Sequence, residues 1–92
     1  MVDGFAETLQ VFQNAYIRVE GNTDSVGNRG ANVALSKRRA LAVVDYLVQR
    51  YKVEPARFIA VGHGPDKPIG DNKTEAGREM NRRTEFKVIA NK

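Results

Sequence analysis

The chain has 92 residues, of which 41% are hydrophobic and 28% are charged, and this is the composition of a small globular domain rather than a disordered segment. It contains no cysteine, so disulfides, thiol catalysis and cysteine-bound zinc are excluded. Fifteen Lys and Arg residues against 11 Asp and Glu residues give a net charge of +4, which fits an anionic partner or simply keeps a small domain soluble. No apolar run approaches the roughly 20 residues that span a bilayer, and no signal peptide opens the sequence.

The first elements are read from the spacing of apolar residues. Helical spacing predicts a short amphipathic helix over residues 5–13. Strict alternation then predicts a strand over residues 16–20, with Ile17 and Val19 on one face and Gly21 at its end.

A turn and a long helix follow. Glycine, asparagine and aspartate over residues 22–30 predict a turn. A continuous apolar stripe predicts a helix over residues 31–51, which Pro55 terminates because proline disfavours helical geometry in the residue before it. Proline at the start of residues 55–57 then favours one further helical turn.

The C-terminal third predicts two more strands and one more helix. We expect a strand over residues 58–61, followed by a mobile loop over residues 62–73. A brief helix over residues 74–81, capped by Thr74, and a strand over residues 83–89 with one solvent-exposed face should complete the chain. This order predicts an α/β sandwich in which a small mixed sheet has its helices packed on one face. The strands on either side of the long helix should be parallel.

Asp24 and Arg39 are the main candidate binding residues. Asp24 lies in a glycine-flanked turn, and Arg39 follows 15 residues later on the long helix. A carboxylate and a guanidinium around one concavity bind a zwitterion, the first holding its ammonium and the second its carboxylate. The alternatives are an aspartate that hydrogen-bonds its own backbone and an arginine that is simply solvated.

Two further motifs contain residue types that can bind a ligand or take part in catalysis. Asn81-Arg82-Arg83 precedes the last strand, so a guanidinium is expected at the same end of the sheet unless the cluster serves only surface salt bridges. His63, the only histidine, lacks the neighbours of a zinc site, and no G-x-S-x-G motif offers a nucleophile. We therefore expect a non-enzymatic protein without a metal or other cofactor.

The motifs taken together resemble the OmpA-like C-terminal domain family, which also occurs in peptidoglycan-associated lipoproteins and in the flagellar stator protein MotB. The resemblance extends over residues 16–89 and rests on GNTDSVG, LSKRRA, GHGPDKPI and DNKTEAGREMNRR in this order. It implies non-covalent binding of peptidoglycan through the diaminopimelate residue of its peptide stem.

The resemblance also implies a set of site residues. Asp24 and Arg39 correspond to the family residues that hold the amine and the carboxylate of diaminopimelate. Asn22 departs from the His or aromatic residue usual at its position, and His63 also replaces an aromatic residue. Besides Asp24 and Arg39, the expected ligand-binding residues are Asn22, Thr23, Ser25, Asn32 and Arg82, whereas His63 is expected only to pack in its loop.

The resemblance further predicts a single domain over residues 1–92, excised from a longer periplasmic envelope protein that it anchors to the cell wall. Membrane contact would come only through missing parts of that protein. The family's first strand is absent, so we expect a partner chain or tail to cover the exposed sheet edge, as in a homodimer. A stator or scaffold role is the alternative, together with a nucleic-acid binder that uses the basic residues Arg29, Lys37, Arg38, Arg82 and Arg83.

Overall fold

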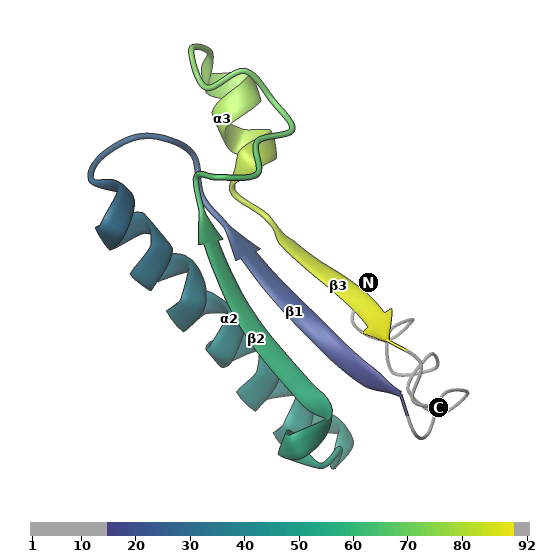
Figure 1. Cartoon of the computed structure of the whole chain (residues 1–92). Coiled ribbons are helices and arrows are strands. Elements are labelled where there is room, and N and C mark those ends of the chain that lie inside the picture. The colour runs from purple at the N-terminus through teal and green to yellow at the C-terminus, as the bar shows by residue number, and fades with distance from the viewer. Residues whose placement is uncertain (1–14, 90–92) are drawn as a thin grey trace.

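The computed structural model describes residues 15–89, so the helix predicted over residues 5–13 lies outside the described residues. Three strands and two helices form this part of the chain, with one 3-10 turn before the second strand (Figure 1). In chain order they are β1 (Tyr16–Asn22), α2 (Arg29–Tyr51), the 3-10 turn η1 (Pro55–Arg57), β2 (Phe58–Gly64), α3 (Glu75–Asn81) and β3 (Thr84–Ile89).

The three strands form one mixed sheet in the order β2-β1-β3. Strand β1 pairs in parallel with β2, as a strand–helix–strand unit requires, and antiparallel with β3. The predicted α/β class with a small mixed sheet is therefore confirmed. Tyr16 pairs with Ile89, so the first and last described strands begin and end side by side, at the end of the sheet away from α3 (Figure 1).

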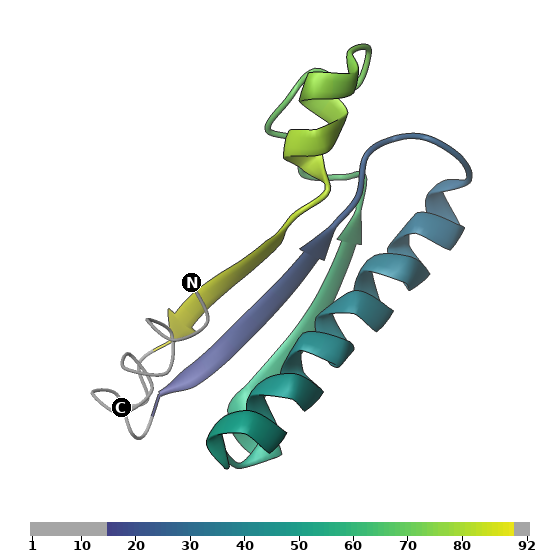
Figure 2. The same cartoon turned by 180° about the vertical axis from the view of Figure 1, so that it is seen from behind.

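The core lies between α2 and one face of the sheet (Figure 2). Ile17 and Val19 point to this face from β1 and are fully buried against Ala40, Val44 and Leu47 of α2. Alternate residues of a strand share a face, so the alternation seen in the sequence places the core side of β1 correctly. Burying each larger aliphatic side chain contributes roughly 1.5–3 kcal/mol, so this small cluster accounts for much of the fold's stability.

Helix α3 lies beyond the end of the sheet rather than on its face, which differs from the expected packing of all helices on one face (Figures 1 and 2). It has only seven residues, and its buried residues are Gly77 and Asn81. Without an apolar stripe, α3 has no surface to pack against the sheet. Polar contacts fix its position instead.

Strand β2 continues to Gly64, so the predicted end of this strand at residue 61 is wrong. The glycines of Gly62-His63-Gly64 suggest a turn, but their small size instead allows β2 to pack closely against α2. A Cβ atom on Gly62 would lie 2.6 Å from the backbone nitrogen of Lys37 in α2. Similarly, β1 continues past Gly21 to Asn22, and a Cβ atom on Gly21 would lie 2.2 Å from the carbonyl oxygen of Ser36.

Helix α2 begins two residues earlier than predicted because Asn28 caps it. The Oδ1 atom of Asn28 accepts a hydrogen bond of 3.0 Å from the backbone nitrogen of Ala31. At the other end Lys52 adopts the left-handed conformation, with φ of 57°, and closes the helix where the sequence predicts it. The predicted Thr74 cap of α3 is also confirmed, because its hydroxyl accepts a 3.0 Å hydrogen bond from Gly77.

Candidate functional site

The turn between β1 and α2 presents Asp24 at the end of the sheet next to α3. Its Oδ1 atom accepts a 3.0 Å hydrogen bond from the backbone nitrogen of Val26, which is the local contact expected of aspartate in a turn. Asn32 supports the same turn, because its side-chain amide donates a 2.8 Å hydrogen bond to the carbonyl oxygen of Val26. Asn32 therefore shapes the turn that carries Asp24.

The second oxygen of Asp24 binds a residue far away in the sequence. Its Oδ2 atom lies 2.7 Å from Nη1 of Arg82, and Nη2 of Arg82 lies 3.2 Å from Oε1 of Glu75. The Arg82 hydrogen bond and, next, that of the Val26 amide lower the pKa of Asp24 below its ordinary value. The two carboxylates raise the pKa of Arg82 in turn, with Asp24 the larger cause. Asp24 is therefore ionised at neutral pH.

Arg39 projects from α2 next to a small hollow between the helix and the start of β3. It is exposed, and it forms no hydrogen bond or ion pair with any of residues 15–89. The hollow has a volume of about 150 Å³ and a positively charged lining. Its lining residues are Gly21, Asn22, Arg39, Arg82, Arg83 and Thr84.

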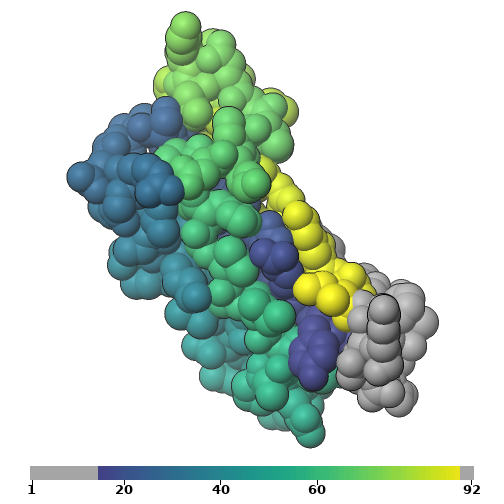
Figure 3. All heavy atoms as spheres, in the orientation of Figure 1, coloured from purple at the N-terminus to yellow at the C-terminus, as the bar shows by residue number. Residues whose placement is uncertain are grey.

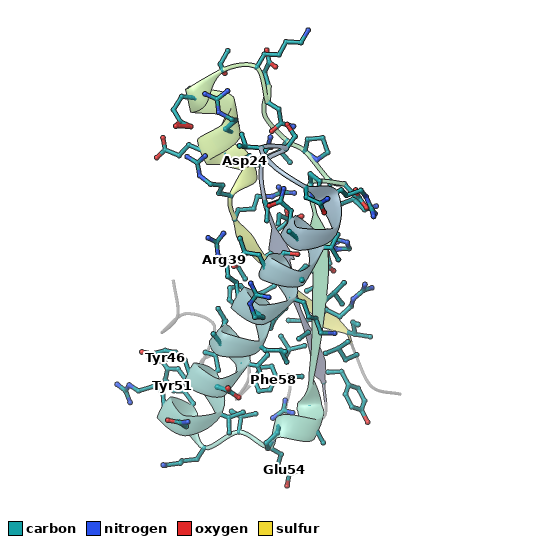
Figure 4. All side chains as sticks on the ribbon, turned by 90° about the vertical axis from the view of Figure 1, so that its left-hand side faces the viewer. Asp24, Arg39, Tyr46, Tyr51, Glu54 and Phe58 are labelled. Carbon is teal, nitrogen blue, oxygen red and sulfur yellow. The ribbon has the colours of Figure 1, made fainter. Side chains whose placement is uncertain are left out.

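Asp24 and Arg39 do not contact each other, and they are connected through Arg82. Figure 4 shows Asp24 close to α3 and Arg39 further along α2. Arg82 lines the hollow with Arg39 and also binds the Asp24 carboxylate. Within residues 15–89, the guanidinium of Arg39 therefore has no ion-pair partner and lines a cationic hollow. The carboxylate of Asp24 binds Arg82, which lines the same hollow.

The other predicted site residues occupy different positions in this region. Asn22 is 3% exposed and lines the hollow. Thr23 is also buried, and its hydroxyl donates a 2.8 Å hydrogen bond to the carbonyl oxygen of Asp24. Ser25 is exposed, and its backbone nitrogen donates a 3.3 Å hydrogen bond to Oδ1 of Asn72. Thr23 and Ser25 thus hold the turn in place through the contacts seen here.

Asn81 organises this region and was missed as a site residue from the sequence. It is fully buried, and its Oδ1 atom accepts hydrogen bonds of 2.7 and 2.8 Å from the backbone nitrogens of Ile69 and Gly70. Its amide donates to the carbonyl oxygen of Gly70 at 3.0 Å and to Oδ1 of Asn72 at 2.8 Å. Because Asn72 also binds Ser25, Asn81 connects the predicted mobile loop to the Asp24 turn. The Asn that precedes two arginines was the available signal, but nothing in the sequence indicates its burial.

Other kinds of site find no support in the described part of the chain. Among residues 15–89, no three His, Cys, Asp or Glu side chains gather to hold a metal ion. None of the helices in the same range combines the length and apolar character needed to cross a bilayer.

Comparison with known sequences places the chain in a family. The OmpA family matches residues 1–82. The chain belongs to the OmpA family. Outer membrane porin F of Pseudomonas aeruginosa is 45% identical over 89 residues, and peptidoglycan-binding protein ArfA of Mycobacterium bovis is 41% identical over 83 residues. These alignments cover 97% and 90% of this chain, but in each case it spans only 25% of the relative's length. The family is non-enzymatic, as expected from the absence of a nucleophile motif.

Solved structures of OmpA-like domains share the fold. The peptidoglycan-associated lipoprotein of Burkholderia pseudomallei matches with a TM-score of 0.83 and 31% identity, covering 95% of this chain and 73% of that one. The C-terminal domain of Helicobacter pylori MotB matches with a TM-score of 0.84 and 26% identity, covering 98% and 70% respectively. The resemblance to peptidoglycan-associated lipoproteins and MotB is therefore confirmed at the level of the fold.

Proposed function

We propose that this domain binds peptidoglycan non-covalently through the diaminopimelate residue of its peptide stem. The observation that carries the proposal is the guanidinium of Arg39, which has no ion pair among residues 15–89 and lines a cationic hollow, together with the ionised Asp24, which binds Arg82 of the same lining. A ligand carbon that bears both an ammonium and a carboxylate needs opposite protein charges at close range, because a charge that is buried without a partner is costly. ArfA is named a peptidoglycan-binding protein, which supports this assignment.

Each charged group has a role in the proposed binding mode. The carboxylate of the ligand enters the hollow and pairs with Arg39 and Arg82, and its ammonium pairs with Asp24. A carboxylate has about four acceptor positions, so Asp24 accepts from the ligand while it keeps the Val26 and Arg82 hydrogen bonds. Arg82 orients Asp24 and joins the two halves of the site.

The proposed cellular role is anchoring of a longer envelope protein to the cell wall from the periplasm. Relatives named as outer membrane proteins and as a peptidoglycan-associated lipoprotein support this location. Charge-assisted hydrogen bonds contribute about 1.5–3 kcal/mol each, and association has its own cost, so one stem would be held with weak to moderate affinity. Many stems on one polymer compensate through avidity, which suits a tether.

Ion pairing argues against the nucleic-acid alternative. Arg29 is paired with Asp66, and Arg83 donates to Glu85, so neither guanidinium is available as an isolated phosphate contact. Arg82 is paired with two carboxylates. The carboxylate of Asp24, which is bound to Arg82, would also repel phosphate.

Calorimetric titration with meso-diaminopimelate and with a diaminopimelate-containing muropeptide tests the proposal. Asp24→Ala and Arg39→Ala are each expected to weaken binding at least about tenfold, because each removes a charge-assisted hydrogen bond. Arg38→Ala and Asp45→Ala are matched controls, because both residues are exposed on α2 and outside the hollow. A muropeptide with lysine in place of diaminopimelate lacks the second carboxylate and should bind far more weakly.

Two results would refute this proposal. The first is the absence of any diaminopimelate binding by the unmodified domain. The second is equal affinity of the Arg39→Ala and Arg38→Ala variants, because both lose one positive charge but only Arg39 lines the hollow.

A further inference from the structure

A second and larger hollow lies on the face of the sheet opposite α2. Residues 18, 20 and 22 of β1 alternate with the core residues and therefore point to this face. Strands β2 and β3 flank β1 here, and no helix of the described residues covers them (Figure 3). The hollow has a volume of about 470 Å³, which is within the usual size of a small-molecule site.

Glu20 forms the floor of this hollow, and one of its oxygens is unsatisfied. The residue is 4% exposed, and its Oε1 atom lies 2.8 Å from Nε2 of His63 and 3.5 Å from Nζ of Lys87. Burial raises the pKa of Glu20, but the His63 hydrogen bond and the nearby positive charges together hold it below its ordinary value, so the group is a carboxylate. Its Oε2 atom is buried and accepts no hydrogen bond within residues 15–89, although Nε of Arg18 lies 3.5 Å away.

Asn22 also lines this hollow and contains a second buried acceptor. Its Nδ2 atom is 3.3 Å from the carbonyl oxygen of Glu20 and 3.5 Å from that of Arg83. Carbonyl oxygens only accept, so these contacts fix the orientation of the amide and turn Oδ1 away from them. Oδ1 of Asn22 is buried and has no donor among the described residues. A buried acceptor without a donor costs about 1–3 kcal/mol, and two in one hollow favour a ligand that brings N–H or O–H groups.

The rim of this hollow has a different chemistry. Four Lys or Arg side chains and two Glu side chains line it, so it is positive overall. The Lys67 ammonium is exposed and forms no close ion pair within residues 15–89, although its charge acts on the neighbouring Asp66. Pro68 and Ile69 add an apolar wall next to it, and Ile69 is 57% exposed. A carboxylate near Lys67 and an apolar group against Pro68 would both be favourable.

We propose that this second hollow binds an N-acylated sugar acid. Its hydroxyl or amide hydrogens would donate to Oε2 of Glu20 and Oδ1 of Asn22, its carboxylate would pair with Lys67, and its acyl methyl group would contact Pro68. Simple cations are disfavoured by the surrounding positive charge. A simple anion leaves the two buried acceptors without a donor.

The choice of a sugar acid rests on the proposed function, because the glycan strand of peptidoglycan supplies this chemistry. Asn22 and Arg83 line both this hollow and the smaller one next to Arg39, so the two sites share a wall. One domain would then contact the stem on the α2 side of the sheet and the glycan on the opposite side.

Titration of the 15N-labelled domain with N-acetylmuramic acid and, separately, with N-acetylglucosamine tests the inference by NMR. The second sugar has a free hydroxyl where the first carries a lactyl ether with its carboxylate, and the two share the N-acetyl group and the rest of the ring. We expect N-acetylmuramic acid to shift the signals of His63, Glu20 and the Asn22 side-chain amide. N-acetylglucosamine should bind about twofold to fivefold more weakly, as expected for the loss of a partly exposed ion pair.

Variants separate this site from the stem-binding site. Lys67→Gln should abolish the difference between the two sugars, whereas Lys37→Gln on α2 should preserve it. Equal affinity of the unmodified domain for both sugars, or an absence of shifts at His63 and Glu20, would overturn the inference. Failure of the stem-binding proposal would instead be seen as unchanged Asp24 and Arg39 signals with diaminopimelate.

Discussion

The carboxylate of Asp24 lies 2.7 Å from Nη1 of Arg82, a residue 58 positions later in the chain. This contact joins the β1–α2 turn to the residue that follows α3. It also explains how two segments without apolar packing between them are held at one end of the sheet. The candidate site therefore includes an ion pair between distant segments in addition to the packing of the core.

The Asp24–Arg82 pair makes stability depend on pH in the acidic range. The pKa of Asp24 is lowered in the folded state, so its contribution is complete above the unfolded value of about 3.9 and is lost as the pH falls through the folded value. We expect Asp24→Asn to lower the free energy of unfolding at pH 7 by less than about 1 kcal/mol, because the pair is partly exposed, and we expect this difference to shrink as the pH falls below about 3.9. Urea unfolding at several pH values, followed by circular dichroism, measures this. A difference between the two proteins that grows toward low pH would contradict the assignment.

Ser36 should be the most sensitive hydroxyl of the fold. Its Oγ atom is buried, donates a 2.8 Å hydrogen bond to Val33 and accepts one of 2.9 Å from the backbone nitrogen of Gly64. Ser36→Ala leaves the buried Gly64 amide without an acceptor, so we expect a loss of about 1–3 kcal/mol in the free energy of unfolding. Ser25→Ala is the matched control, with an expected change within about 0.5 kcal/mol because that side chain is exposed. Similar urea midpoints for the two variants would show that the Gly64 amide finds another acceptor.

Asn81→Ala should release the loop before α3. The substitution removes both acceptor contacts, to Ile69 and Gly70, and the donor contact to Asn72. With two backbone amides left unsatisfied, we expect a loss of roughly 2–4 kcal/mol and faster amide hydrogen exchange between residues 69 and 72. Met80→Ala is a suitable control, because this neighbouring side chain is 54% exposed. Unchanged exchange in the loop would contradict the role given to Asn81.

Gly21 should tolerate no side chain. A Cβ atom there would lie 2.2 Å from the carbonyl oxygen of Ser36, so α2 would have to move away from β1. We expect Gly21→Ala to cost at least about 1–3 kcal/mol, as for other overpacked positions. Gly30→Ala in the first turn of α2 is the control and should cost less than Gly21→Ala, because alanine favours the helix and the only near atom in the described part of the chain, at 3.2 Å, is Oδ1 of the Asn28 side chain rather than backbone. Urea unfolding of both variants measures the two changes in unfolding free energy, and equal changes would contradict the prediction.

The sequence predicts the fold well where the pattern is periodic and local. The alternation around Ile17 and Val19 and the stripe that includes Leu47 identify the buried face of β1 and of α2. The predicted end of β2 is wrong because of Gly62 and Gly64. In a sequence, a glycine that lets a helix pack closely against a strand looks the same as a glycine that forms a turn. No local pattern distinguishes the two cases.

The candidate site was predicted only in part. Charge and spacing predict that Asp24 and Arg39 face one shared concavity, whereas in the structure Asp24 binds Arg82, and Arg82 rather than Asp24 lines the hollow with Arg39. Contacts between residues dozens of positions apart have no local signal, and for the same reason the burial of Asn81 and of Glu20 was not foreseen.

The antiparallel pairing of Tyr16 with Ile89 has a mechanical consequence for a tether. Both chain ends of the described fold lie at one end of the sheet, and the Asp24 turn lies at the other (Figure 1). Tension between a ligand at that turn and the C-terminal end of β3 runs lengthwise along β1 and β3, while the hydrogen bonds between these two strands are perpendicular to it. Those bonds are then loaded together in shear instead of being peeled apart one after another, which is the more resistant geometry under a pulling force.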